Sequence, residues 1–442
     1  FDKAIQLYQK AIELNPQYAN AYNNLGFAYN HKGNVDKAIQ LYQKAIELNP
    51  QCADAYNNLG TAFFDKGNVD KAIQLYQKAI ELDPQSDITY SNLGAAYSDK
   101  GNFDKAVELY EISIKLNPQY VNAYYNLGVT YNKKDNLDKA IEFYEKAIEL
   151  SEKTIELNPK IFEAYSNLGA AYVKKSNFDK AIQLYEKAIE LKPNDAKSYL
   201  GRGYAKAALN NYQGAIADYT EAIFLKPNDD AAYIKRGYAK AALNDKQGAI
   251  TDFTEAIKLK PDDAFAYNGR AGIKFDLKDY QGAIADCTEA IKLKPDDAIA
   301  YYFKGVAKAN LNDYQGAISD YTEAIKLMPD DADAYYYRGS AESNLKDSQG
   351  AIADYTEAIQ LKPNFADAFA YRGKEKVILG DYQGALADFT EAIKLKPNDG
   401  SAFICRGIVY LNLDHKSEAK ADFMKAIELG IRVPDSLLDR CR

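Results

Sequence analysis

Prolines recur along this chain at a fixed interval of 34 residues. Twelve of the thirteen prolines follow this interval in two runs, Pro16, Pro50, Pro84 and Pro118, and then Pro159, Pro193, Pro227, Pro261, Pro295, Pro329, Pro363 and Pro397. A period of this length is typical of solenoids of helix pairs, in which each pair buries its apolar face only against its neighbours. The 442 residues therefore correspond to a number of repeats, and function is expected on an extended surface instead of in one catalytic pocket.

Aligning the repeats on these prolines, counted as position 32, gives half a repeat followed by twelve complete ones. The complete repeats begin at Ala19, Ala53, Asp87, Val121, Phe162, Ala196, Asp230, Ala264, Ala298, Ala332, Ala366 and Gly400. Position 4 is aromatic throughout, and position 8 is glycine in all but the eighth repeat, where Ala271 stands. This four-residue spacing marks one face of a first helix, and alanine, an aromatic residue and alanine at positions 20, 24 and 27 mark a second helix.

At these positions the chain resembles the tetratricopeptide repeat family over essentially its whole length. The resemblance implies an all-α, right-handed superhelical solenoid of antiparallel helix pairs, about twelve and a half units long, whose first helices line a concave groove. It also implies a role in binding peptides or proteins. The first five repeats further resemble the superhelix of O-linked N-acetylglucosamine transferase, and the later repeats resemble those of cyanobacterial proteins.

Two positions change together partway along the array. In the first five complete repeats position 7 is leucine and position 23 is apolar, whereas in the last seven position 7 is basic and position 23 is aspartate. This joint change predicts contact between the two helices of each repeat, with a leucine pair replaced by an ion pair. We therefore expect the second helix of a truncated repeat at 1–18, five leucine-paired repeats at 19–195, seven Arg/Asp-paired repeats at 196–433 and a short tail at 434–442.

The fourth repeat is longer than the others. Pro118 and Pro159 are 41 residues apart, and the seven extra residues form a tandem heptad across 145–158. Seven residues add nearly two helical turns and shift the apolar face by only about 20°. We expect a lengthened second helix. The insertion is either a tolerated duplication without a role, or it locally changes the pitch of the superhelix or contacts a partner.

Position 6, which faces the groove in the family, differs between the two blocks of repeats. In the first block it is always asparagine: Asn24, Asn58, Asn92, Asn126 and Asn167. A carboxamide both donates and accepts hydrogen bonds, so a row of them can hold the backbone of an extended peptide. The alternative is that these asparagines only solvate the exposed edge of the helix.

The second block places aromatic residues at position 6 of three consecutive repeats and at position 5 of two of them. They are Tyr302, Phe303, Tyr336, Tyr337 and Tyr371. If they face the groove, they suit apolar or proline-rich segments. The alternative is that they pack against the next repeat. Lysine at position 11 is expected to be solvated or paired with aspartate.

The composition disfavours catalysis and nucleic-acid binding. The two histidines, His31 and His415, lie almost the whole array apart, so we expect no catalytic residue, metal or cofactor. The net charge of −8 is unlike that of phosphate-tracking surfaces, and four scattered cysteines favour reduced thiols. No apolar stretch approaches the roughly 20 residues that span a bilayer.

We therefore expect a cytoplasmic, non-catalytic scaffold whose partners are proteins or peptides, with no nucleic acid and no membrane insertion. Two alternatives stay open. One is a structural element that self-associates through its repeat ends, since the tail offers only Leu437 and Leu438 to cover one end. The other is the recruitment arm of a larger enzyme whose catalytic domain is missing.

Overall fold

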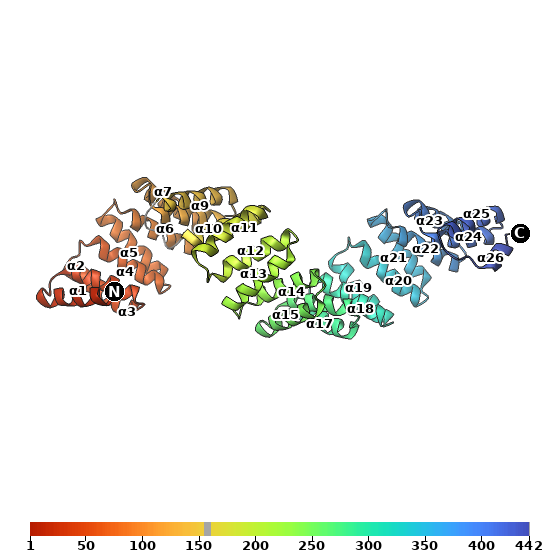
Figure 1. The fold of residues 1–442 in the computed structure, drawn as a ribbon, viewed down its shortest axis with the longest axis horizontal. Helices are drawn as coiled ribbons and strands as arrows, with labels where there is room; N and C mark the ends of the chain where they lie inside the picture. The colour runs from red at the N-terminus through yellow and green to blue at the C-terminus, as the bar shows by residue number, and fades with distance from the viewer. Residues whose placement is uncertain (154–160, 442) are drawn as a thin grey trace. The chain divides into compact units, whose positions relative to one another are not determined.

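The computed structural model describes residues 1–153 and 161–441, and every regular element within them is a helix (Figure 1). Helix α1 (Asp2–Leu14) is the expected half repeat. The first helices of the complete repeats are α2 (Ala19–His31), α4 (Ala53–Asp65), α6 (Asp87–Asp99), α8 (Val121–Lys133), α10 (Ile161–Lys174), α12 (Ala196–Ala208), α14 (Asp230–Ala242), α16 (Ala264–Asp276), α18 (Ala298–Asn310), α20 (Ala332–Asn344), α22 (Ala366–Ile378) and α24 (Gly400–Asn412).

The second helices alternate with these along the chain. They are α3 (Val35–Leu48), α5 (Val69–Leu82), α7 (Phe103–Leu116), α9 (Leu137–Glu152), α11 (Phe178–Leu191), α13 (Tyr212–Leu225), α15 (Lys246–Leu259), α17 (Tyr280–Leu293), α19 (Tyr314–Leu327), α21 (Ser348–Leu361), α23 (Tyr382–Leu395) and α25 (Lys416–Glu428). A short helix, α26 (Asp435–Asp439), follows the last repeat. The prediction of an all-α solenoid of consecutive helix pairs is confirmed.

The turn inside each repeat is encoded by two residues. Position 15 has a positive φ in every complete repeat, for example +80° at Gly33 and +63° at Asn312, and this left-handed residue ends the first helix. In every complete repeat but the last, the next side chain caps the second helix; in the first, Asn34 Oδ1 accepts a hydrogen bond from the Lys37 backbone N–H at 3.3 Å. Adjacent residues therefore end the first helix and begin the second.

The two helices of a repeat meet where an aromatic ring packs against a glycine. In the first complete repeat the Tyr42 ring is 1% exposed and lies so close to Gly26 that an added Cβ would be 2.8 Å from its Cε1 atom. Ala38 and Ala45 on the same second helix are fully buried. Small residues thus let the helix backbones approach closely.

The chain forms two compact units, residues 1–227 and 228–442. Within each unit the helices of a repeat pack together, and each second helix packs on the first helix of the following repeat. The division falls one repeat after the change in sequence at 195/196, so the first Arg/Asp-paired repeat belongs to the first unit.

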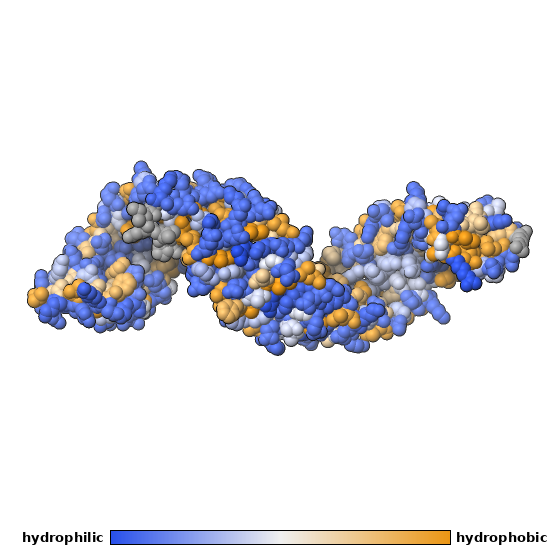
Figure 2. Space-filling model, in the orientation of Figure 1, coloured by the Kyte–Doolittle hydropathy of each residue, from blue (hydrophilic) through white to orange (hydrophobic). Residues whose placement is uncertain are grey.

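Consecutive repeats of the two blocks also differ on their surface. In the first block lysine at position 14 forms an ion pair with aspartate at position 18 of the preceding repeat, as in Lys66–Asp36 at 2.7 Å and Lys100–Asp70 at 2.6 Å. In the second block position 14 is mostly an exposed leucine, such as Leu311 and Leu345. Figure 2 shows hydrophobic residues in several groups among the hydrophilic residues that cover most of the visible face.

The second helix of the fourth repeat is longer than its counterpart in the third, and the C-terminal tail covers the last repeat. Helix α9 has 16 residues, compared with 14 in α7. Residues 154–160, where the rest of the lengthened second helix is expected, lie outside the described residues, so the full extension stays a prediction. At the C-terminal end Leu437 and Leu438 pack against the last repeat's buried cluster.

Candidate functional site

A buried ion pair joins the two helices of each second-block repeat. Arg202, Arg236, Arg270, Arg338, Arg372 and Arg406 each donate from Nε and Nη2 to the two carboxylate oxygens of the aspartate sixteen residues later, at 2.6–3.0 Å. In the remaining repeat Lys304 binds Asp320 at 3.3 Å. These aspartates are buried, so the bidentate pairs replace leucine contacts inside the structure and leave position 7 unavailable to a ligand.

A second cation joins most of these pairs. Lysine at position 11 binds the same aspartate at 2.7–2.8 Å in five repeats, through Lys206, Lys240, Lys274, Lys308 and Lys376. The tenth repeat has Glu342 in this place. Burial, and then the negative charge of Asp354, raise the pKa of Glu342 to about 7. Among the described residues, Arg338 is therefore the one cation paired with Asp354.

The candidate residues lie on what we name the first-helix face, the surface that positions 2, 5, 6 and 9 of the first helices form within each unit. The asparagine row, Asn24, Asn58, Asn92, Asn126 and Asn167, belongs to the first unit. Four of its members donate from Nδ2 to position 5 of the preceding repeat: Asn58 to Asn23 at 3.1 Å, Asn92 to Asn57 at 2.9 Å, Asn126 to Ser91 at 3.4 Å and Asn167 to Tyr125 at 3.1 Å. The row thus links consecutive repeats while remaining partly exposed.

These acceptors were not predicted from the sequence. Asn23, Asn57, Ser91 and Tyr125 all carry an oxygen at position 5, and that shared property was the available signal.

Asn167 also lines a polar recess of about 390 Å³ on the first-helix face. Its other lining residues are Tyr125, Phe162, Glu163, Ser166, Lys192, Asp195 and Lys197. The Tyr125 hydroxyl donates to Glu163 at 2.9 Å, and burial together with that carboxylate raises the pKa of Tyr125. The Lys192 ammonium lies 4.1 Å from the centre of the Phe162 ring. The recess therefore offers charged groups of both signs.

The aromatic strip, Tyr302, Phe303, Tyr336, Tyr337 and Tyr371, lies on three consecutive first helices of the second unit. Its rings touch across repeats, with centroids 5.8 Å apart for both Tyr302–Tyr337 and Tyr336–Tyr371. Three of the rings keep 38–41% of their surface exposed. The strip therefore combines both arrangements considered from the sequence: its members pack against the next repeat and still present ring surface to solvent.

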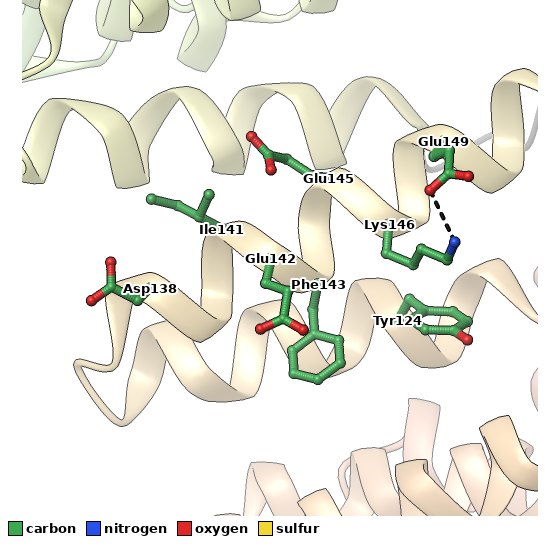
Figure 3. Close-up of a pocket in the computed structure, with 8 residues that line it drawn as sticks. All are labelled: Tyr124, Asp138, Ile141, Glu142, Phe143, Glu145, Lys146 and Glu149. Atoms are coloured by element: carbon green, nitrogen blue, oxygen red, sulfur yellow. Dashed lines mark hydrogen bonds and ion pairs between the residues drawn. The ribbon is translucent and has the colours of Figure 1, made fainter.

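A different recess, of about 740 Å³, lies between α8 and α9 (Figure 3). Tyr124 comes from α8, whereas Phe143 and several acidic residues come from α9, with Asp138 at the end opposite the Lys146–Glu149 ion pair. Most of its carboxylates already bind lysine: Asp138 binds Lys175, Glu145 binds Lys180, and Glu149 binds Lys146 and Lys153. We therefore place the candidate site on the first-helix face and not in this recess.

The described residues contain no group of three His, Cys, Asp or Glu side chains placed to hold a metal ion. His31 and His415 are exposed at helix ends. None of the described helices combines the length and apolar character needed to cross a membrane.

Comparison with protein families gives matches along most of the chain. Models described as "Tetratricopeptide repeat" match residues 1–51, 17–85, 51–119, 85–148 and 119–194, and again 332–365, 367–399 and 406–429. A model described as "ETO1 C-terminal domain" matches residues 158–334. Among curated proteins, none matches the chain.

Several solved structures are similar to parts or all of the chain. The crystal structure of the APC/C hetero-tetramer Cut9–Hcn1 is 16% identical, covers 99% of this chain and 92% of its own, and has a TM-score of 0.43. YrrB, described as a TPR protein with an unusual peptide-binding site, is 22% identical over 44% of this chain and 97% of its own, with a TM-score of 0.38. MamA is 33% identical over 39% of this chain and 97% of its own, with a TM-score of 0.33.

Proposed function

The chain belongs to the tetratricopeptide repeat family, and we propose that it is a non-catalytic scaffold that binds an extended segment of a partner protein along its first-helix face. The observation that carries this proposal is the aromatic strip. Large, partly exposed rings held in place by their neighbours are favoured anchors in protein interfaces, because they bury much apolar area at little cost in conformational entropy. The strip would accept apolar or proline-rich parts of the segment.

The first unit would contribute hydrogen bonds. The asparagine row lies in the repeats that resemble the superhelix of O-linked N-acetylglucosamine transferase, and its carboxamides can bind the backbone of an extended peptide. Because four of its amides already donate to the preceding repeat, the row would act mainly through its carbonyl oxygens, which accept from peptide N–H groups. The net charge of −8 favours protein partners over nucleic acid, and we place this activity in the cytoplasm.

The proposal is tested by selecting binders to the full chain from a displayed library of random peptides and measuring their Kd by fluorescence anisotropy. Tyr337→Ser with Tyr371→Ser is expected to weaken the selected peptides about tenfold or more, the loss expected for interface anchors. The matched control is Leu311→Ser with Leu345→Ser, which removes two side chains that are 38% and 45% exposed at the ends of α18 and α20. Enrichment of no peptide, or equal losses in both variants, would contradict the proposal.

A further inference from the structure

The packing of rings in the aromatic strip is the same in two repeats and changes in the next. In the ninth repeat the buried ring of Tyr321 contacts both Tyr302, at position 5 of the same repeat, and Tyr337, at position 6 of the next. In the tenth repeat Tyr355 contacts Tyr336 and Tyr371 in the same way. Each of these two position-24 rings is thus covered from the first-helix face by two further rings.

In the eleventh repeat both covering positions hold small residues. The ring at position 24 is Phe389, position 5 is Ala370, and position 6 of the next repeat is Cys405. A cavity of about 220 Å³ is present here, and these three residues line it together with Tyr371, Lys374, Asp367, Asp399, Ser401 and Ala402. Apolar cavities of about 150 Å³ bind benzene, so this space is large enough for one aromatic ring.

We infer that this cavity is a socket for a single aromatic side chain of the partner's segment, next to an acidic group of that segment. The occupant is indicated by the protein itself, because the two preceding repeats fill the same place with the rings of Tyr302 and Tyr336. A ring entering the socket would stack beside Tyr371 and above Phe389, and would continue the strip by one repeat.

The charged groups around the socket indicate an acidic group beside the aromatic side chain of the partner's segment. Asp367 pairs with Lys396 at 3.5 Å, and Asp399 accepts the backbone N–H groups of Ser401 and Ala402 at the start of α24. Lys374 is exposed, its ammonium lies 4.5 Å from the centre of the Tyr371 ring, and it makes no ion pair with any described residue. Both carboxylates at the mouth thus already accept hydrogen bonds or an ion pair, whereas the Lys374 ammonium is left to pair with a carboxylate beside the aromatic ring.

Cys405 allows the socket to be tested directly in the full chain. Iodoacetamide alkylation of each cysteine is followed by mass spectrometry, with 4-hydroxyphenylacetate as the probe. At ten times its Kd the probe is expected to slow alkylation of Cys405 about tenfold, because only the unoccupied form reacts. Cys52, which lies in the first unit, should be unaffected, and Cys287, which is 1% exposed, should stay unreactive while the second unit is folded.

Two variants and two further probes make the outcome decisive. Ala370→Tyr supplies the ring found in the two preceding repeats, so Cys405 should be protected without probe and the probe should have no further effect. Lys374→Gln should weaken 4-hydroxyphenylacetate by about fivefold and leave uncharged p-cresol unchanged. Absence of protection up to the solubility limit, equal protection by cyclohexylacetate, or an unchanged probe effect in folded Ala370→Tyr would overturn the inference.

The inference rests on the proposed function, yet the two can fail separately. The alkylation experiment uses no peptide, so peptides that bind the aromatic strip but ignore Ala370→Tyr would refute the socket alone. A socket that binds the probe in a chain that enriches no peptide would refute the scaffold proposal alone.

Discussion

Replacing Arg338 with leucine is expected to destabilise the tenth repeat more than the same change at Arg372 destabilises the eleventh. Arg338 Nε and Nη2 each donate to Asp354 at 2.7 Å, and Asp354 is 6% exposed. Without the arginine this carboxylate stays buried beside Glu342 and has no cation. Removing one partner of a buried ion pair costs about 3–5 kcal/mol, and we expect a loss in that range.

The eleventh repeat keeps a second cation. Asp388 still binds Lys376 at 2.8 Å when Arg372 is removed, and a hydrogen bond to a charged group contributes about 1.5–3 kcal/mol. Arg372→Leu should therefore cost about 2 kcal/mol less than Arg338→Leu. The double variant Arg338→Leu with Asp354→Leu recreates the leucine pairing of the first five repeats and should recover most of the loss.

The assay is native-state hydrogen exchange of the full chain, read on the amides of α20–α21 and α22–α23, because repeats in an array open locally. A difference of 2 kcal/mol corresponds to about a thirtyfold difference in protection. Equal losses for Arg338→Leu and its double variant would show that the ion pair is not the cause. Equal losses for Arg338→Leu and Arg372→Leu would show that Lys376 does not compensate.

Three further predictions concern other positions. The pKa of Glu342 is raised from 4.5 to about 7, so the contribution of this group to stability is complete below pH 4.5 and is lost as the pH rises through 7. Glu342→Lys should therefore flatten the dependence of the melting temperature on pH between 5 and 8, and an unchanged profile would contradict this prediction. Gly201→Ala puts a Cβ into the Tyr185 ring and should cost about 1–3 kcal/mol by urea denaturation, whereas tolerance would mean that the ring can move. Lys100→Ala removes only the exposed pair with Asp70 and should leave exchange in α5 and α6 unchanged; a clear loss of protection would contradict this.

Features set within one repeat could be predicted from the sequence. Eleven of the twelve first helices begin at the residue obtained by counting from the prolines, and the other begins at Ile161, one residue before the expected Phe162. The pairing of positions 7 and 23 was visible because both change at the same point of the chain. Position 11 lysine, predicted to be either solvated or paired with aspartate, pairs with aspartate in five repeats.

Features that join neighbouring repeats could not be predicted in the same way. The acceptors of the asparagine row and the gap above Phe389 depend on how one helix pair is rotated on the next, and a constant period does not contain that angle. Ala370 and Cys405 are 35 residues apart, and neither is unusual alone. Only the structure shows that both border one ring.

Arginines of the second block also form hydrogen bonds with the preceding repeat. Arg270, Arg338, Arg372 and Arg406 each donate from Nη1 to the threonine at position 25 of the preceding repeat, at 3.0–3.3 Å. The first-block repeat before Arg202 has Glu186 at that position. A second-block repeat of 34 residues could therefore be inserted or deleted between two other second-block repeats, and the arginine–threonine hydrogen bonds to its neighbours would form again. The same repeat inserted among the leucine-paired repeats would lack this threonine partner. Evolution or design can therefore change the length of the array more freely within its second block than across the boundary between the blocks.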